Sequence, residues 1–255
     1  MACSKLDRVN HTDYLANVYS EISFVQKEHG KELIKQLSLA KNMKVLDLGC
    51  GTGYLSALLA DCVGPEGEVV AVDPDEARLA LAKEQYSRPN LVFIHANDAT
   101  FPEGQYDLVF TNFVLHWVGN KAALLNKVYQ NLKPGGQFAS VFPEHQPAVF
   151  DCMVDLMGQE MAKEMNKDYH WILALEYNHL ATAVGFNVTS CNVQNKTLYF
   201  TNVETLLKWF CVSTGGRFDP KKVNPATLEE FKWPYGDGPA TIEDHHTVTV
   251  ILSKP

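Results

Sequence analysis

The sequence predicts an α/β fold in which a mostly parallel sheet is covered by helices on both faces. Between residues 44 and 142, short apolar runs alternate with segments of helical periodicity, which is typical of strand–helix–strand units with right-handed crossovers. The runs are apolar throughout, as expected of strands buried on both faces. A glycine-rich turn follows the first run directly. Together these observations predict a doubly wound sheet.

Seven strands are predicted, and they are listed here in chain order. They lie at residues 44–48, 68–73, 91–95, 107–111, 137–142, 188–194 and 247–253. Helical patterns lie at residues 54–63, 74–87, 120–132 and 203–211. Residues 20–39 also place apolar side chains at three- and four-residue steps, which indicates one helical face before the first strand.

After Pro143 the strand–helix alternation stops. Residues 145–184 are expected to form one or two amphipathic helices. We interpret 145–184 and 200–240 as excursions over the sheet, because long insertions in such folds commonly cover a site. The chain of 255 residues, 46% of them hydrophobic, carries enough apolar material for one sizeable core. We therefore expect a single domain.

Composition and charge narrow the class of partner. Lys and Arg number 22 against 30 Asp and Glu, a net charge of −8, which disfavours nucleic acid as the main partner. Neither a signal peptide nor a run of about 18 apolar residues is found, so we expect no membrane segment. The 6 cysteines show no C-x-x-C spacing and are expected to be free thiols. We expect a soluble, cytoplasmic monomer.

The motif VLDLGCGTG at 45–53 is the strongest functional signal. Glycines at 49, 51 and 53 allow a sharp turn and let a ligand approach the backbone without a Cβ in the way. The N–H groups at the start of the following helix favour an anionic group. In the dinucleotide fingerprint the third glycine would fall on Tyr54, so a pyrophosphate site is disfavoured.

Asp73 ends the second predicted strand, 20 residues after Gly53. A carboxylate at this position can accept hydrogen bonds from both hydroxyls of a ribose. This arrangement serves nicotinamide dinucleotides and S-adenosylmethionine (SAM) equally. The alternative is a helix N-cap ahead of Pro74, although Asp75 is the better cap.

Residues 40–145 resemble the class I SAM-dependent methyltransferases, enzymes with a Rossmann-like fold. VLDLGCGTG is similar to their first motif, YDLVFTNFVLHWV (106–118) to their fourth strand and active-site edge, and LKPGGQFASV (132–141) to the turn and strand that follow. The resemblance implies SAM as cofactor and a last strand that inserts antiparallel beside the sixth. It divides the domain into an N-terminal helical cap (1–40), a SAM-binding core (41–143) and an acceptor lid with the last strands (144–255).

The same resemblance implies the residues of the cofactor site. They are Tyr19, Asp47, Gly49, Cys50, Gly51, Gly53, Asp73, Pro74, Asn97, Asp98, Ala99, Asn112 and Phe113. Asp47 is expected near the amino group of SAM, and Asp98 is expected to accept from the adenine amine. The chemistry agrees with this assignment, since transfer of the methyl group is an in-line displacement that depends mainly on alignment.

The string LHWV (115–118) resembles one branch of these enzymes, the juvenile hormone acid and trans-aconitate carboxyl methyltransferases. Tyr19 and Gln26 have the spacing of that branch's N-terminal segment. The resemblance implies that Gln26 and Trp117 hold the carboxylate of a small-molecule acceptor. A carboxylate, with a pKa of about 4, is already a nucleophile at neutral pH and needs no base.

Each acceptor-site residue also allows a second interpretation. Gln26 is also compatible with a solvated helix flank, Trp117 with a core aromatic, and His116 with either a base for a phenol or amine or a structural role. No metal is expected, because the adjacent His245 and His246 point to opposite faces of a strand.

The function as a whole has rival interpretations as well. The acceptor could be nitrogen, carbon or a metalloid, and a metalloid would want thiols near the methyl group, which makes convergence of Cys152, Cys191 and Cys211 the feature to look for. A SAM-binding regulatory protein without turnover and a nicotinamide-dependent oxidoreductase are the remaining rivals.

Overall fold

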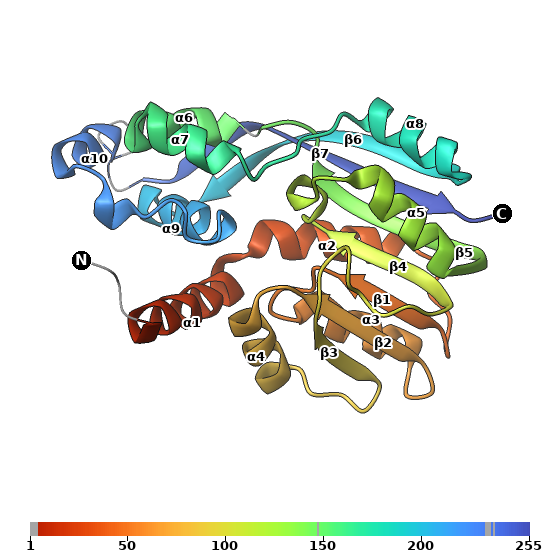
Figure 1. The fold of residues 1–255 in the computed structure, drawn as a ribbon. Helices are drawn as coiled ribbons and strands as arrows, with labels where there is room; N and C mark the ends of the chain where they lie inside the picture. The colour runs from red at the N-terminus through yellow and green to blue at the C-terminus, as the bar shows by residue number, and fades with distance from the viewer. Residues whose placement is uncertain (1–4, 147, 233–235, 237) are drawn as a thin grey trace.

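The structure, a computed structural model, describes residues 5–146, 148–232, 236 and 238–255, and its centre is a seven-stranded sheet of order β3-β2-β1-β4-β5-β7-β6 (Figure 1). The strands are β1 Lys44–Leu48, β2 Glu68–Asp73, β3 Leu91–His95, β4 Tyr106–Asn112, β5 Leu132–Pro143, β6 Asn187–Phe200 and β7 Ala240–Ser253. β1 to β5 are parallel, and β7 runs antiparallel between β5 and β6. The predicted seven strands and antiparallel last strand are confirmed.

The helices follow the predicted order, with additions at the N-terminus and in the lid. They are α1 Lys5–Ile22, α2 Phe24–Gln36, α3 Tyr54–Val63, α4 Glu76–Gln85, α5 Lys121–Asn131, α6 Ala148–Met157, α7 Gln159–Asn166, α8 Ala174–Val184, α9 Val203–Ser213 and α10 Pro225–Lys232, with short 3₁₀ turns η1 Leu115–Trp117 and η2 Pro220–Lys222. Residues 145–184 hold three helices, so the expectation of one or two was wrong. No helix in the described ranges is both long enough and apolar enough to cross a bilayer.

Alternate residues of each central strand face opposite helical layers. Val45 packs in a cluster with Leu33 of α2 and Leu59 of α3. Its neighbour Leu46 packs in a second cluster with Leu125 of α5 and Tyr177 of α8. Because both faces are buried, the strands read as continuous apolar runs, and the predicted doubly wound arrangement is confirmed.

A third apolar cluster lies beyond the carboxyl ends of the parallel strands, where β6 and β7 extend further than predicted. The far ends of these strands, Phe200 and Ala240, pair with each other and pack with Met153 of α6 and Phe210 of α9. Figure 1 shows α6, α7, α9 and α10 gathered at this end, with α1 below them. The long β6–β7 pair thus carries the lid helices to the carboxyl edge of the parallel strands.

Candidate active site

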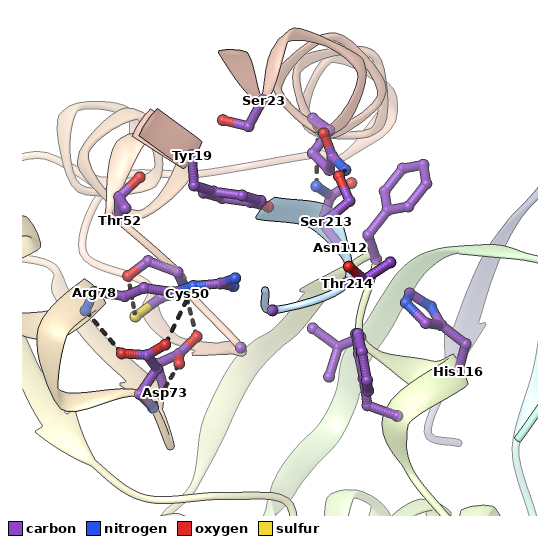
Figure 2. A pocket seen from close by; sticks show the side chains of 18 of the residues that line it. Tyr19, Ser23, Cys50, Thr52, Asp73, Arg78, Asn112, His116, Ser213 and Thr214 are labelled. Atoms are coloured by element: carbon purple, nitrogen blue, oxygen red, sulfur yellow. Dashed lines mark hydrogen bonds and ion pairs between the residues drawn. The ribbon is translucent and has the colours of Figure 1, made fainter. Parts of the chain in front are cut away.

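A cavity of about 370 Å³ lies at the carboxyl ends of β1, β2 and β4, which contribute Asp47, Asp73 and Asn112 to its wall. Carboxyl strand ends are the usual ligand site of an open α/β sheet. Figure 2 shows two groups of side chains, with Asp73, Cys50 and Arg78 on one side and His116 on the other, and Tyr19 reaching in from α1. The two sides are called the cofactor end and the acceptor end below.

The glycine turn lets the backbone form the floor of the cofactor end. Gly49, Gly51 and Gly53 all have positive φ, at 79°, 56° and 84°, a region that L side chains rarely adopt. A Cβ on Gly49 would come within 2.2 Å of Val114, and one on Gly51 would point at Tyr19, 3.6 Å away. Side chains would therefore strain the turn and narrow the cavity.

Asp73 is buried at the end of β2 and fixes the glycine turn. One carboxylate oxygen accepts from the N–H of Gly51 at 2.8 Å, and the other accepts from the N–H of Asp75 at 2.9 Å. Burial raises the pKa of Asp73, and the nearby Arg78 guanidinium opposes this rise. Asp75 caps α4 by accepting from the N–H groups of Ala77 and Arg78, so Asp73 is not the helix cap.

Asp47 lies at the end of β1 and is 2% exposed. Its carboxylate accepts a hydrogen bond from the Ser56 hydroxyl at 2.6 Å. Burial raises the pKa of Asp47 to about 7, against the opposing effect of the Ser56 bond, and the charge of Asp73 adds to the rise. A cationic ligand at this position would favour the ionised carboxylate.

Gln26 is buried, at 8% exposure, so it is not a solvated helix flank. Its Nε2 donates to the Ser213 hydroxyl, and its Oε1 accepts from the Trp209 indole, both at 3.4 Å. The backbone carbonyl of Gln26 accepts from the Asn112 amide at 3.0 Å. These bonds fix the start of α2 between the end of β4 and α9, with the Gln26 side chain in the cavity wall.

Beyond Gln26 the acceptor end is walled by aromatic rings. Trp117 in η1 lies 4.4 Å from Tyr169, centroid to centroid, and Tyr169 stacks on Trp171 at 5.1 Å with planes 3° apart. The Arg217 guanidinium lies 5.1 Å from the centroid of Trp117. Such a wall suits the apolar or aromatic part of a small molecule, since small-molecule pockets are lined mainly by hydrophobic and aromatic side chains.

His116 is buried against the same rings and stays neutral near pH 7. Burial, together with the positive charge of Lys121, lowers the pKa of His116 to about 3. Among the described residues its Nδ1 has no hydrogen-bond partner, while its backbone carbonyl accepts from the N–H of His170 at 2.8 Å. A group with so low a pKa is a poor acceptor of a substrate proton near neutral pH.

Phe113 lies just after β4 in the left-handed region, with φ 57°. Its N–H donates to the carbonyl of Val141 at 2.8 Å, and its ring packs 5.5 Å from that of His29. A non-glycine residue held in this region costs of order 1–3 kcal/mol and is typical of functional sites. The turn directs the chain from β4 into η1, where His116 and Trp117 lie.

Comparison with known proteins identifies the class. Residues 39–208 match the family model described as a methyltransferase domain, which is well over half of the chain. The chain belongs to the SAM-dependent methyltransferases. The domain is of class I, with SAM as its cofactor, as the resemblance implied.

Individual relatives of the methyltransferase agree with this assignment. The demethylmenaquinone methyltransferase of Listeria monocytogenes is 32% identical over 157 residues, which cover 56% of this chain and 65% of that enzyme. The enzyme of the same name from Staphylococcus aureus is 30% identical over 187 residues, covering 68% of this chain and 73% of its own. A candidate methyltransferase of Bacillus halodurans superposes with a TM-score of 0.63 at 18% identity, covering 89% and 98% of the two chains, and so shares the fold.

Most of the cofactor residues predicted for the methyltransferase line one cavity. The predicted residues found in its wall are Tyr19, Asp47, Gly49, Cys50, Gly51, Asp73, Pro74, Asn112 and Phe113. Gly53 lies behind the wall as the N-cap of α3. Their individual contacts with SAM stay predictions.

The predicted adenine segment lies outside this cavity. The side-chain oxygen of Asn97 accepts from the N–H groups of Ala99 and Thr100, at 2.9 and 3.0 Å, and thereby closes the turn after β3. Asp98 is partly buried and Ala99 is exposed. These three residues are therefore not in the wall of this cavity, although the N–H of Ala96, just before Asn97, donates to the carbonyl of Asp73 at 3.3 Å. Asn97 has a local role in the turn, and the contact of Asp98 with adenine stays a prediction.

Arg78 lines the cavity but was not predicted from the sequence. From the first turn of α4, its guanidinium lies 4.3 Å from the centroid of the Tyr19 ring and donates to the carbonyl of Val212 in α9 at 3.3 Å. It also lies 3.5 Å from the Asp75 carboxylate. Its position 5 residues after Asp73, where its charge acts on the carboxylate predicted to bind the ribose, is the signal that could have identified it. Arg78 thus joins α1, α4 and α9 around the cofactor end.

Replacing Arg78 by alanine is expected to speed release of S-adenosylhomocysteine about tenfold. The variant loses a cation–π contact and a charged hydrogen bond, each of about 1 kcal/mol or more. Stopped-flow fluorescence measures the dissociation rate. Arg88→Ala, which removes a surface guanidinium paired with Asp61 at 2.9 Å, is the matched control. Equal dissociation rates in Arg78→Ala, Arg88→Ala and the wild type would show that Arg78 does not slow the release of S-adenosylhomocysteine.

Proposed function

We propose that this methyltransferase transfers the methyl group of SAM to a carboxylate oxygen of a small acid with an apolar body. The observation that carries the proposal is the chemistry of the acceptor end, where the described residues offer hydrogen-bond donors beside aromatic walls but no suitable base. Gln26 and Trp117, the two donors implied by the carboxyl methyltransferase branch, both line the cavity. A carboxylate held between them would lie next to the cofactor end.

The lack of a base favours a carboxylate over a phenol. A phenol gives up a proton on methylation, and a side chain with a pKa near neutrality would assist its transfer. Burial lowers the pKa of His116 to about 3 and raises that of Tyr169. Asp47, with a pKa of about 7, lies at the cofactor end and is bonded to Ser56. Within the described part of the acceptor end, a carboxylate is thus the acceptor that suits the side chains.

A second candidate acceptor is a carbon of an aromatic ring. The relatives from Listeria and Staphylococcus are named for demethylmenaquinone. The stacked rings of Trp117, Tyr169 and Trp171 would also accommodate a flat ring system. This candidate predicts a product whose new methyl group is stable to base.

A metalloid acceptor and a regulatory role without turnover receive less support from the described residues. Cys191 is exposed on β6 and Cys211 is in α9, and neither lines the cavity, while the side chain of Cys152 lies outside the described residues. A thiol cluster for a metalloid therefore has no support here. A regulatory role would be favoured by a closed acceptor end, whereas a cavity is open next to Trp117.

The test uses SAM labelled on its methyl group with a panel of fatty, isoprenoid and short polycarboxylic acids, phenols, quinols and amines. Extracted product is treated with mild base, and we expect label to be released as volatile methanol, the mark of a methyl ester. Base-stable label would overturn the carboxylate assignment in favour of nitrogen, carbon or phenol transfer. SAM binding with no transfer to any acceptor would favour the regulatory role.

Gln26→Glu separates a carboxylate acceptor from a neutral one. The new carboxylate can still accept from Trp209, but it places a negative charge against a substrate anion, which costs several kcal/mol and is expected to lower kcat/KM about 100-fold. Gln36→Glu, on the exposed face of the same helix, is the matched control. A variant that retains full activity toward the acid would contradict the proposed role of Gln26.

A further inference from the structure

Glu144, His145 and His246 meet outside the active-site cavity, at the carboxyl end of β5. One ligand atom from each residue lies within 4.8 Å of the others, and the two imidazole rings are 4.8 Å apart, centroid to centroid. The register of the sheet fixes this meeting, because Pro143 pairs with Thr247 and the N–H of Glu144 donates to the carbonyl of His246 at 3.4 Å. The cluster therefore depends on two adjacent antiparallel strands.

Two of the three side chains are already oriented by contacts to the backbone. The Nδ1 of His145 lies 3.1 Å from the carbonyl oxygen of Gln146, an arrangement that, when Nδ1 carries the proton, leaves the lone pair of Nε2 for a ligand. One oxygen of Glu144 accepts from the N–H of Ala174, at the start of α8, at 2.9 Å. Metal-ligating histidines and carboxylates are commonly held by such partners.

We propose that Glu144, His145 and His246 form a binding site for a divalent transition-metal ion, with zinc as the best match. Two imidazoles and one carboxylate are a recurrent zinc ligand set, which leaves a further position for water or an exogenous ligand. Calcium and magnesium prefer oxygen ligands throughout, so two histidines disfavour them. The three ligand atoms, which lie within 4.8 Å of one another, would have to move closer around a bound ion, and the exposed His145 side chain is the one placed to do so.

A bound ion would connect three segments around the acceptor end. Glu144 directly follows Pro143, which lines the active-site cavity, and its carboxylate also contacts the first residue of α8. Residues 169 and 171, just before α8, supply the aromatic wall. Zinc would therefore fasten β5 to β7 and hold the segment that carries this wall, without contact to SAM or the acceptor.

The two histidines of this cluster lie 101 residues apart, so no local sequence pattern indicates the site. In the sequence His246 stands beside His245, whose side chain lies outside the described residues. The partner of His246 is His145 across the sheet, which only the β5–β7 register reveals.

The experiment titrates zinc chloride into the chelator-treated, full-length protein by isothermal titration calorimetry, with the thermal midpoint as a second measure. We expect saturable binding of a single ion and a rise in the midpoint, since a ligand that binds only the folded state stabilises it. We expect zinc binding to weaken more than about tenfold in each of the variants His145→Gln, His246→Gln and Glu144→Gln, because each loses one of the proposed metal ligands. Glu144→Gln keeps an oxygen that can accept from Ala174.

His179→Gln, an exposed histidine on α8, is the matched control and should bind zinc as the wild type does. No saturable binding to the wild type would overturn the proposal. So would binding that persists in His145→Gln and His246→Gln, or binding that is lost instead in Cys191→Ser, because Cys191 is the exposed free thiol among the described cysteines.

Discussion

Replacement of Asp73 by alanine is expected to weaken SAM binding about 100-fold or more. In the proposed complex its carboxylate accepts from both ribose hydroxyls, and a hydrogen bond to a charged group contributes about 1.5–3 kcal/mol. Loss of two such bonds corresponds to at least two factors of ten in Kd. The alanine variant also releases the N–H groups of Gly51 and Asp75, which Asp73 now holds at 2.8 and 2.9 Å, so the glycine turn loses its anchor.

Asp73→Asn tests the electrostatic part of this effect separately. Its amide has one oxygen where Asp73 has two, so an NH₂ group must face either the N–H of Gly51 or that of Asp75. Asp75→Asn is the matched control, because asparagine is an equally good helix N-cap. Calorimetry with SAM should give a Kd raised strongly in both Asp73 variants and within about threefold of the wild type in Asp75→Asn. Folded Asp73 variants with a wild-type Kd would exclude the ribose contact.

The sheet could be predicted from the sequence because its signals are local. Val45 and Leu46 face different helical layers, yet both are apolar, and a short apolar run followed by a glycine turn indicates a buried parallel strand without further context. α1 lies in the N-terminal helical cap that the family resemblance implied, but its own sequence did not indicate it, since its apolar residues do not gather on one face and it is held by packing on α4 and α9. Tertiary contacts, which the local pattern does not contain, decide such a helix.

The cofactor end of the cavity could likewise be predicted from a local motif, whereas the acceptor end could not. Asp47, Gly49 and Gly51 belong to one continuous motif, so their shared position followed from the sequence. Tyr169 and Trp171 come from a lid segment without a motif, and nothing local separates an aromatic ring that walls a cavity from one that fills a core. The burial of Gln26 likewise depends on α9, 183 residues away, which supplies its partner Trp209.

Asp47→Asn is expected to raise the stability of the cofactor-free protein at pH 8. Burial raises the pKa of Asp47 to about 7, whereas an unfolded chain has a carboxyl pKa of about 3.9. Between these values the folded state holds the extra proton, so the contribution of Asp47 to the free energy of unfolding falls as the pH rises through this window. Asparagine removes the buried charge and can still accept from Ser56. Thermal midpoints at pH 5 and pH 8 measure the effect, with the exposed Asp61→Asn as control.

The same substitution is expected to weaken SAM binding and to remove its dependence on pH. Wild-type Asp47 is largely protonated below its pKa, but the SAM ammonium group would favour the carboxylate, so binding releases a proton. Affinity for SAM should therefore rise between pH 5.5 and 7, by at most about tenfold per pH unit for one proton. In this range an α-amino group with a pKa of about 7.7–8.0 stays charged.

Calorimetry in buffers of different ionisation enthalpy counts the protons released. A wild-type affinity that is flat over this range, together with an unchanged Kd in Asp47→Asn, would place the SAM ammonium group elsewhere. A more stable variant that binds SAM poorly would mean that Asp47 is kept buried at the expense of stability because the cofactor's positive charge needs it there.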